Sequence, residues 1–192
     1  MRQKFDFSIL NSLNRKRRIL IIGAPCTGKS TLAKAISESL EIKFVDLDNL
    51  LWQPAWVKTE ASEFMQKYRD EIAKDAWVIS GNISSTEEII LQRTDAIIWL
   101  DYPLAFTFMR GLRRSLTRSL KKEECCNGNF ESLWRTFSPK DSVLVWILKT
   151  HTRRRRRYLE WRERVKNSEI EFYQIAKPIE VSQLKTFLCA SQ

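Results

Sequence analysis

The sequence predicts an α/β fold: a five-stranded parallel sheet with helices on both of its faces. Three observations support this prediction. Short apolar runs alternate with helical patterns, the first run leads through a glycine-rich loop into a helix, and no internal repeat or low-complexity linker intervenes. The 192 residues, 43% of them hydrophobic, are enough to bury one sizeable core. We therefore expect residues 1–192 to form a single domain.

Five apolar runs are predicted as strands. The first, Arg18 to Ile22, is rich in isoleucine and ends at Gly23, which is typical of a parallel strand that is buried on both faces. We expect this strand at the centre of the sheet. The four later strands are predicted over residues 43–47, 77–79, 96–100 and 170–175.

The helices are predicted from apolar residues that recur every three or four positions and from capping residues. Ser84 and Glu87 have the spacing of a capping box, and Ser138 followed by Pro139 is typical of a helix start. The predicted helices cover residues 29–40, 60–74, 84–91, a segment that opens at Pro103, 138–165 and 179–188.

Composition excludes several classes of protein. The basic stretch 1–18 lacks the apolar segment of a signal peptide, and no run of 18 apolar residues occurs, so we expect a soluble cytoplasmic protein that does not enter a membrane. The four cysteines show no C-x-x-C spacing and only one histidine accompanies them, which argues against a metal-thiolate site. We assign no role to the adjacent Cys125 and Cys126.

The net charge of +10 is concentrated in one third of the chain. Residues 101–166 hold 17 Lys and Arg against 7 Asp and Glu, whereas the rest of the chain is balanced. Such a block is compatible with a nucleic-acid-binding surface or with a lid that neutralises a triphosphate. Charge alone does not choose between the two.

The strongest motif is G-x-x-x-x-G-K-[ST], which lies between the first strand and the first helix, as a P-loop requires. Its glycines let backbone N–H groups approach phosphates, and the helix N-terminus adds partial positive charge. Lys29 is expected to reach the β- and γ-phosphates of ATP, and the Ser30 hydroxyl to ligate Mg²⁺. The expected ATP-binding residues are Gly23, Ala24, Pro25, Cys26, Thr27, Gly28, Lys29, Ser30 and Thr31.

Two carboxylates follow at the end of the second predicted strand. On an extended chain Asp46 and Asp48 point to the same side, and ligands of parallel α/β sheets bind at the carboxyl ends of strands. We expect Asp46 to help hold Mg²⁺ and Asp48 to accept a proton from the attacking hydroxyl. The alternative is that Asp48 only caps the next turn.

Aromatic residues come directly after these carboxylates. Trp52 and Trp56 flank Pro54 in a stretch that is unsuited to a regular helix and lies near the ligand edge of the sheet. They are candidates for the wall of an acceptor pocket. Ordinary packing of the two indoles is the alternative.

A cluster of arginines follows the fourth predicted strand. Arg110, Arg113 and Arg114 lie on the helix that Pro103 opens, and Arg114 and Arg118 share a face. Guanidinium groups donate bidentate hydrogen bonds to phosphates, so these arginines are candidates for stabilising the transferring group. A solvated basic face is the alternative. Most of the run Arg153 to Arg157 is expected to face solvent, because it spans more than one helical turn.

Several segments together resemble the bacterial DNA topology modulation (FlaR-type) proteins, which are adenylate-kinase-like P-loop ATPases or kinases. Besides the P-loop, the resemblance rests on four segments over about residues 17–165, of which the first is the most specific. They are Leu47-Asp48-Asn49-Leu50-Leu51-Trp52-Gln53-Pro54-Ala55-Trp56, Trp77-Val78-Ile79-Ser80-Gly81-Asn82, Trp99-Leu100-Asp101-Tyr102-Pro103 and Lys149-Thr150-His151.

The resemblance implies a nucleoside-monophosphate-kinase-like P-loop NTPase fold, with an acceptor-binding region over about 48–76 and a lid near 110–135. On this basis Asn82 is expected to join the acceptor-binding residues. Ser80 stands where such proteins commonly carry Asp before Gly-Asn, so a carboxylate that would help organise Mg²⁺ is missing.

Two functions follow from these patterns. The first is a kinase that uses ATP and Mg²⁺ to phosphorylate a nucleotide, a nucleoside or another small hydroxylated metabolite. The second is a nucleic-acid-associated P-loop ATPase that uses the basic segment 101–166, although no nucleic-acid-binding motif accompanies the charge. The identity of the acceptor depends on pocket shape and is not encoded in a motif.

Overall fold

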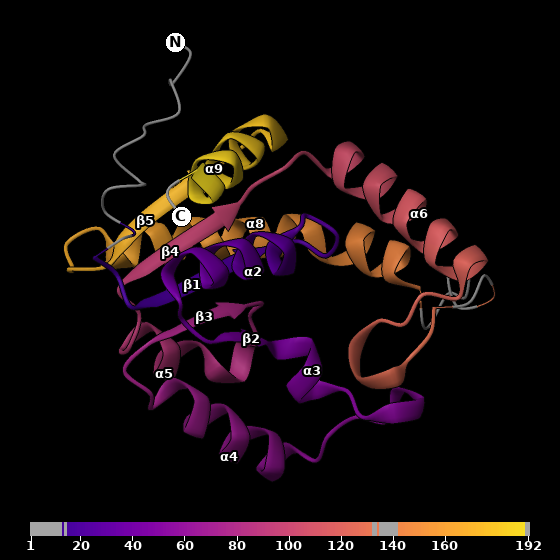
Figure 1. Cartoon of the computed structure of the whole chain (residues 1–192), viewed down its shortest axis with the longest axis horizontal. Helices are drawn as coiled ribbons and strands as arrows, with labels where there is room; N and C mark the ends of the chain where they lie inside the picture. The colour runs from indigo at the N-terminus through magenta and orange to yellow at the C-terminus, as the bar shows by residue number, and fades with distance from the viewer. Residues whose placement is uncertain (1–12, 14, 132–133, 135–141, 191–192) are drawn as a thin grey trace.

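The computed structural model describes residue 13, residues 15–131, residue 134 and residues 142–190 (Figure 1). The strands form one five-stranded sheet in the order β2-β3-β1-β4-β5, and every pair of neighbours is parallel. The predicted fold class is confirmed, and the first strand lies at the centre of the sheet as expected. The strands are β1 (Arg18–Gly23), β2 (Phe44–Asp46), β3 (Trp77–Ser80), β4 (Ala96–Leu100) and β5 (Glu171–Ile175).

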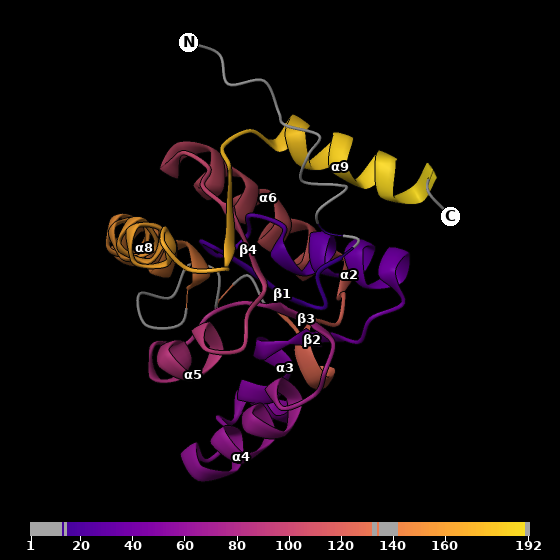
Figure 2. The same ribbon diagram turned by 90° about the vertical axis from the view of Figure 1, so that its left-hand side faces the viewer.

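Helices cover both faces of the sheet (Figure 2). The helices α2 (Lys29–Leu40) and α9 (Pro178–Ala190) pack on one face, and α4 (Ala61–Ile72), α5 (Glu87–Leu91) and α8 (Val143–Val165) pack on the other. Side chains of β1 alternate between the two cores: Ile19 and Ile21 enter the first, whereas Leu20 and Ile22 enter the second. This alternation is the period-two pattern of a strand that is buried on both faces.

The remaining elements lie at the carboxyl ends of the strands or beyond them. The helix α3 (Leu47–Leu51) follows β2 directly, and α6 (Leu104–Lys121) follows β4 with Pro103 as its N-cap residue. Three short 3₁₀ turns complete the described chain: η1 (Pro54–Trp56), η2 (Ser84–Thr86) and η3 (Cys126–Gly128). Parallel strands whose connections all cross over the sheet faces leave this edge open for ligands.

One local prediction is corrected, and another concerns residues outside those that the structure describes. Ser84 and Glu87 do not form a capping box, because the Ser84 hydroxyl accepts a hydrogen bond from Arg157 and Glu87 accepts one from the Trp161 indole. The predicted helix start at Ser138 lies outside the described residues. The described part of that helix begins at Val143, and Ser142 caps it by accepting hydrogen bonds from two backbone N–H groups. Within the described chain no helix is both long enough and apolar enough to span a membrane.

Candidate active site

The P-loop connects β1 to α2 at the centre of the sheet edge. Gly28 caps α2 in a left-handed conformation, φ 94°, and offers no side-chain cap, so the first backbone N–H groups of the helix are available to a ligand. Gly23 must also be glycine, because a Cβ there would lie 2.8 Å from the Leu100 carbonyl oxygen. The loop is held internally by the Thr27 hydroxyl, which donates to the Ala24 carbonyl over 2.9 Å.

Lys29 folds back over this loop. Its ammonium group donates to the Ala24 carbonyl oxygen over 2.9 Å, and burial lowers the pKa of the group. The charges that act on it most strongly are Asp48, which raises its pKa, and Arg154, which lowers it. Asp48 and Arg154 therefore lie within electrostatic range of Lys29, although both are distant from it in the sequence.

The Ser30 hydroxyl lies among polar groups from the two neighbouring strands. It is 3.0 Å from the Ser80 hydroxyl at the end of β3, and it also donates toward Asp46 at the end of β2. Burial raises the pKa of Asp46, and the charge of Asp48 adds to this effect. The hydroxyl of Ser80 thus lies directly beside that of Ser30, at the end of the neighbouring strand.

Asp46 and Asp48 do not lie on one extended segment, so that prediction is wrong. The strand β2 ends at Asp46, and the chain turns at once into α3, where Asp48 is an exposed first-turn residue. The cap of α3 is Asp46, whose carboxylate accepts from the Asp48 backbone N–H over 3.2 Å. The alternative that Asp48 serves as a cap is therefore also wrong, and its carboxylate is left for the site.

The arginines of α6 separate into different environments. A Cβ on Gly28 would lie 3.0 Å from a terminal nitrogen of Arg110, so this guanidinium lies directly on the P-loop. Arg114 pairs with Glu131 at 3.3 Å, whereas Arg113 is exposed and forms no ion pair within the part of the chain described. Only Arg110 of the predicted three already touches the phosphate-binding loop.

A glycine brings α6 close to the P-loop. Gly111 lies where a Cβ would be 2.9 Å from the Ile147 Cδ1 atom of α8 and 3.4 Å from the Cys26 sulfur. Cys26 is buried, and burial raises the pKa of its thiol, as expected for a space-filling residue of the loop. This close packing is what places Arg110, one residue earlier, over Gly28.

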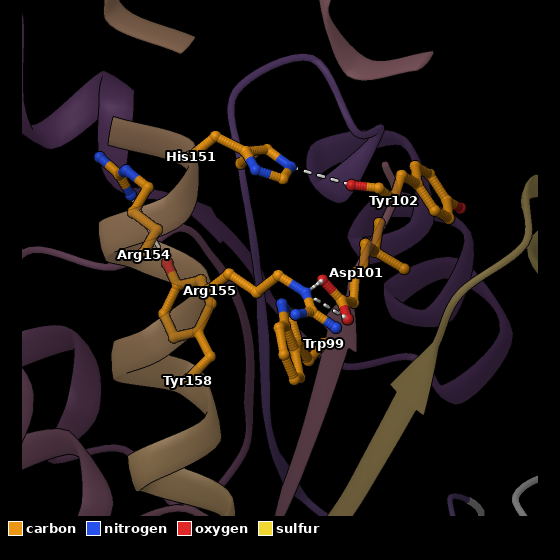
Figure 3. A pocket seen from close by; sticks show the side chains of 9 residues that line it. Trp99, Asp101, Tyr102, His151, Arg154, Arg155 and Tyr158 are labelled. Atoms are coloured by element: carbon orange, nitrogen blue, oxygen red, sulfur yellow. Dashed lines mark hydrogen bonds and ion pairs between the residues drawn. The ribbon is translucent and has the colours of Figure 1, made fainter. Parts of the chain in front are cut away.

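The helix α8 supplies side chains to a pocket beside the P-loop residue Ala24 (Figure 3). His151 is 3.0 Å from the Tyr102 carbonyl oxygen, and Arg155 forms an ion pair with Asp101 at 3.0 Å. Arg154 is half-buried, lies with its guanidinium carbon 5.8 Å from the Trp146 ring centroid, and forms no ion pair with a carboxylate of the described residues. Arg154 is therefore a cation in the neighbourhood of Lys29 that no carboxylate of the described residues neutralises.

Sequence reasoning missed Arg154 because it stands within a run of five arginines. Three members of the run, Arg153, Arg155 and Arg156, are exposed as expected, whereas Arg154 and Arg157 are half-buried, and Arg157 contacts Ser84 and Glu87. Helical spacing offered a signal. Arg154 is four residues before the buried Tyr158, so it lies on the face of α8 that turns toward the sheet.

The predicted acceptor-binding residues lie on two segments, one after α3 and one after β3. Trp52 and Trp56 are half-buried and pack edge to face, with ring centroids 5.8 Å apart. Asn82 follows β3, and its Oδ1 atom is buried without a hydrogen-bond partner in the described chain. An unsatisfied amide oxygen at the ligand edge of the sheet is a candidate for contact with a hydroxyl or amine donor.

A P-loop on the central strand, a lysine over it, carboxylates beyond the neighbouring strand and an arginine-bearing helix define the class of adenylate-kinase-like P-loop kinases. The model of the family "SKI: Shikimate kinase" matches residues 25–170. This match covers more than half of the chain, so the protein belongs to the shikimate kinase family.

Individual relatives agree with this placement. The chain is 36% identical over 104 residues to a shikimate kinase of Clostridium beijerinckii, a match that covers 46% of this chain and 61% of that protein. It is 27% identical over 105 residues to the uncharacterized protein YqaC of Bacillus subtilis, a match that covers 54% of this chain and 59% of that protein. The chain thus spans about three fifths of the length of these curated relatives.

Solved structures show the same fold. A shikimate kinase of Aquifex aeolicus superposes with a TM-score of 0.54 at 19% identity, covering 91% of this chain and 95% of that one. A gluconokinase of Sinorhizobium meliloti gives a TM-score of 0.51 at 15% identity, covering 91% and 90%. At these identities the likeness concerns the fold alone.

Proposed function

We propose that the protein transfers the γ-phosphoryl group of ATP to a hydroxyl group of a small anionic metabolite. The observation that carries the proposal is the position of Lys29 on the Ala24 carbonyl, beside a pocket that Ala24 and Arg154 line, with Asp48 and Arg154 as the charges that act on Lys29 most strongly. A phosphate-side cation, an exposed carboxylate and an arginine without a fixed anion are the groups that phosphoryl transfer to a hydroxylated acid requires.

The phosphate side fits ATP and Mg²⁺. The uncapped N-terminus of α2 and the backbone of residues 23–31 would hold the phosphates, and the Ser30 hydroxyl with the Asp46 carboxylate would hold the metal. When bound, MgATP supplies the phosphoryl group and the metal charge that balances it. Arg110 is already over Gly28, so it is suited to stabilise charge on the transferring group.

The acceptor side is assigned to residues 48–76 and Asn82. Asp48 is exposed and stands one helical turn from the end of α3, so its carboxylate is free to take the proton of an acceptor hydroxyl. Arg154 would bind the anionic group of the acceptor, and Trp52 and Trp56 would wall the pocket. The lid would comprise residues 110–135, of which 132–133 and 135 lie outside the described residues.

We also propose that the chain belongs with the FlaR-type topology modulation proteins inside this class. The Asp-x-Leu-x-Trp-x-Pro-x-Trp segment that ends at Trp56 supports this assignment. The alternative role on nucleic acid has less support than charge suggested, because Arg154, Arg155 and Arg157 of the basic segment contact other parts of the protein.

An acceptor panel tests the kinase function. ADP release is measured with shikimate, with gluconate, with nucleosides and with nucleoside monophosphates, in parallel with neutral analogues in which the acid group is an amide. We expect acceptor-dependent ADP release for an anionic hydroxylated compound, and Arg154→Ala should raise its KM about tenfold while the KM of the neutral analogue stays unchanged. ADP release that no acceptor stimulates would contradict the proposal.

A further inference from the structure

A loop that follows α6 is hydrogen-bonded to the acceptor side of the site. Residues 124–130, here called the cap loop, are closed by a bridge between Glu124 and Phe130. Figure 1 places this loop against the segment that follows α3. That segment, residues 49–56, is here called the acceptor segment, and it begins directly after Asp48.

Asn127 binds the end of α3. Its Nδ2 atom donates to the backbone carbonyls of Asn49 and Trp52, each over 2.6 Å. These carbonyls belong to the last turn of a short helix and to its C-cap, where intrahelical donors run out. Asn127 thus satisfies two carbonyls of the acceptor segment from a position more than 70 residues away in the chain.

Asn129 binds the other half of the acceptor segment and is only 2% exposed. Its Nδ2 atom donates to the Gln53 carbonyl over 2.9 Å, and its Oδ1 atom accepts from the Trp56 backbone N–H over 2.6 Å. The Trp56 indole N–H donates in turn to the Phe130 carbonyl over 3.3 Å. One buried amide therefore forms hydrogen bonds with both a carbonyl group and an N–H group of the backbone that carries the two tryptophans.

The fastened backbone is strained. Ala55 and Trp56 are consecutive non-glycine residues with φ values of 60° and 58°, in the left-handed region that L-residues avoid. Such conformations are unfavourable for L-residues and persist only where the surroundings fix them. The hydrogen bond from the Trp56 backbone N–H to Asn129 is a contact that fixes this backbone conformation. The packing of Trp52 against Trp56 therefore depends on the cap loop.

The cap loop also reaches the proposed base. Cys126 feels the charges of Asp48 and Asp46, and burial raises the pKa of its thiol to about 11. Its neighbour Cys125 donates from its sulfur to the Asn129 carbonyl over 3.0 Å, inside the loop. Cys126 stands next to Asn127, which binds the carbonyl of Asn49 directly after Asp48, so Cys126 lies on the acceptor side and not on the phosphate side.

We propose that Asn127 and Asn129 are positioning residues that fasten the cap loop to the acceptor segment and so set the affinity for the phosphoryl acceptor. Both residues act through the backbone of 49–56 and neither contacts the P-loop. They therefore affect the acceptor and leave ATP binding unchanged. The inference rests on the proposed function, since it takes Asp48 and the tryptophan pair as the acceptor side.

The main test uses Asn129→Asp, which keeps the oxygen that accepts from Trp56 but removes the donor to the carbonyls of Gln53 and Cys126. We expect the acceptor KM to rise about tenfold, while kcat and the ATP KM stay within about twofold. Asn127→Ala, at an exposed side chain, should raise the acceptor KM about threefold. The matched control is Asn167→Asp, at an exposed asparagine in the turn after α8, which should change none of these values.

A second readout follows the loop without any acceptor. Iodoacetamide labelling of Cys126, located by peptide fragmentation, should be about tenfold faster in Asn129→Asp, because a released thiol regains a lower pKa. Folded variants with an unchanged acceptor KM, or with equal rises in the KM of acceptor and ATP, would overturn the inference. If the wild-type protein phosphorylates no acceptor of the panel, the proposed function fails. The labelling experiment still tests the asparagines in that case, because unchanged labelling of Cys126 in Asn129→Asp would show that they do not hold the loop in place.

Discussion

The proposed phosphate side and the proposed acceptor side of the site are built in different ways. The phosphate side is one continuous segment, residues 23–31, whose conformation follows from glycines and from a helix start. The acceptor side is assembled from α3, the residues after β3, the cap loop and α8, with contacts such as the one between Asn127 and Asn49 that span 78 positions. The first can be recognised as a motif, whereas the second exists only after folding.

The electrostatics of the two sides differ as well. Lys29 is half-buried, desolvation lowers its pKa, and a backbone carbonyl holds its ammonium group in place. On the acceptor side Asp48 is exposed, and Arg154 forms no ion pair with a carboxylate of the described residues. The phosphate side is therefore organised in advance, and the acceptor side is the part that a ligand completes.

Lys29→Ala is expected to have the largest effect, because it removes the cation of the organised side. Turnover should fall by about 10³-fold while the fold is kept, since the side chain contacts one loop carbonyl and no core residue. Acceptor-stimulated ADP release and the far-UV circular dichroism of the variant check this. A well-folded variant with near-normal turnover would remove the P-loop from the mechanism.

Asp48→Asn should follow, with a loss of about 10²-fold in turnover and little change in ATP affinity. The reason is that Asp48 faces the acceptor and lies outside the loop that would hold the phosphates. ATP affinity is measured by calorimetry with a non-hydrolysable analogue, and turnover with the acceptor. A defect confined to ATP or Mg²⁺ binding would mean that Asp48 belongs to the metal site and not to the acceptor side.

The sequence predicted the phosphate side better than the acceptor side for physical reasons. A buried strand, a glycine loop and an amphipathic helix each have a local signal, so β1, the loop and α2 were predicted close to their observed bounds. The short helix α3 has no such signal. Five residues are too few for a periodic pattern, and the strand was extended through Leu47, which placed Asp46 and Asp48 wrongly.

Residues that act through tertiary contacts were harder still to find. Arg154 is chemically identical to its four neighbours in the run, and only the packing of Tyr158 and Trp161 selects the face on which it lies. Asn127 and Asn129 carry no local signal of such a role. Their amides satisfy backbone groups of a segment more than 70 residues earlier, which no local pattern encodes.

Arg110 and Arg113 allow a matched comparison on one helix. Arg110→Ala should reduce turnover about tenfold, because its guanidinium lies on Gly28 and is close to where the transferring group would be. Arg113→Ala is the control, and it should change turnover by less than about twofold since the side chain is exposed and unpaired within the described chain. Steady-state assays at fixed ionic strength check both. Equal losses in the two variants would indicate a general charge effect and not a placed arginine.

The smallest expected effect concerns Ser80, which stands between the two sides at the end of β3. Its hydroxyl is 3.0 Å from that of Ser30, so Ser80→Asp would put a carboxylate beside the proposed Mg²⁺ ligand. We expect the Mg²⁺ concentration for half-maximal turnover to fall about threefold. The new charge would lie near Asp46, whose pKa is already raised by burial, and two adjacent carboxylates raise each other's pKa further. Both groups must lose their protons to bind the metal, so the gain in apparent Mg²⁺ affinity should grow as pH increases from 6 to 8.

Titrations with Mg²⁺ at pH 6 and pH 8 measure this gain in Ser80→Asp. Ser80→Ala is the control that removes the hydroxyl without adding charge. If Ser80→Asp instead weakens Mg²⁺ dependence at every pH, then the serine is required to position Ser30, and a carboxylate cannot take its place in this chain.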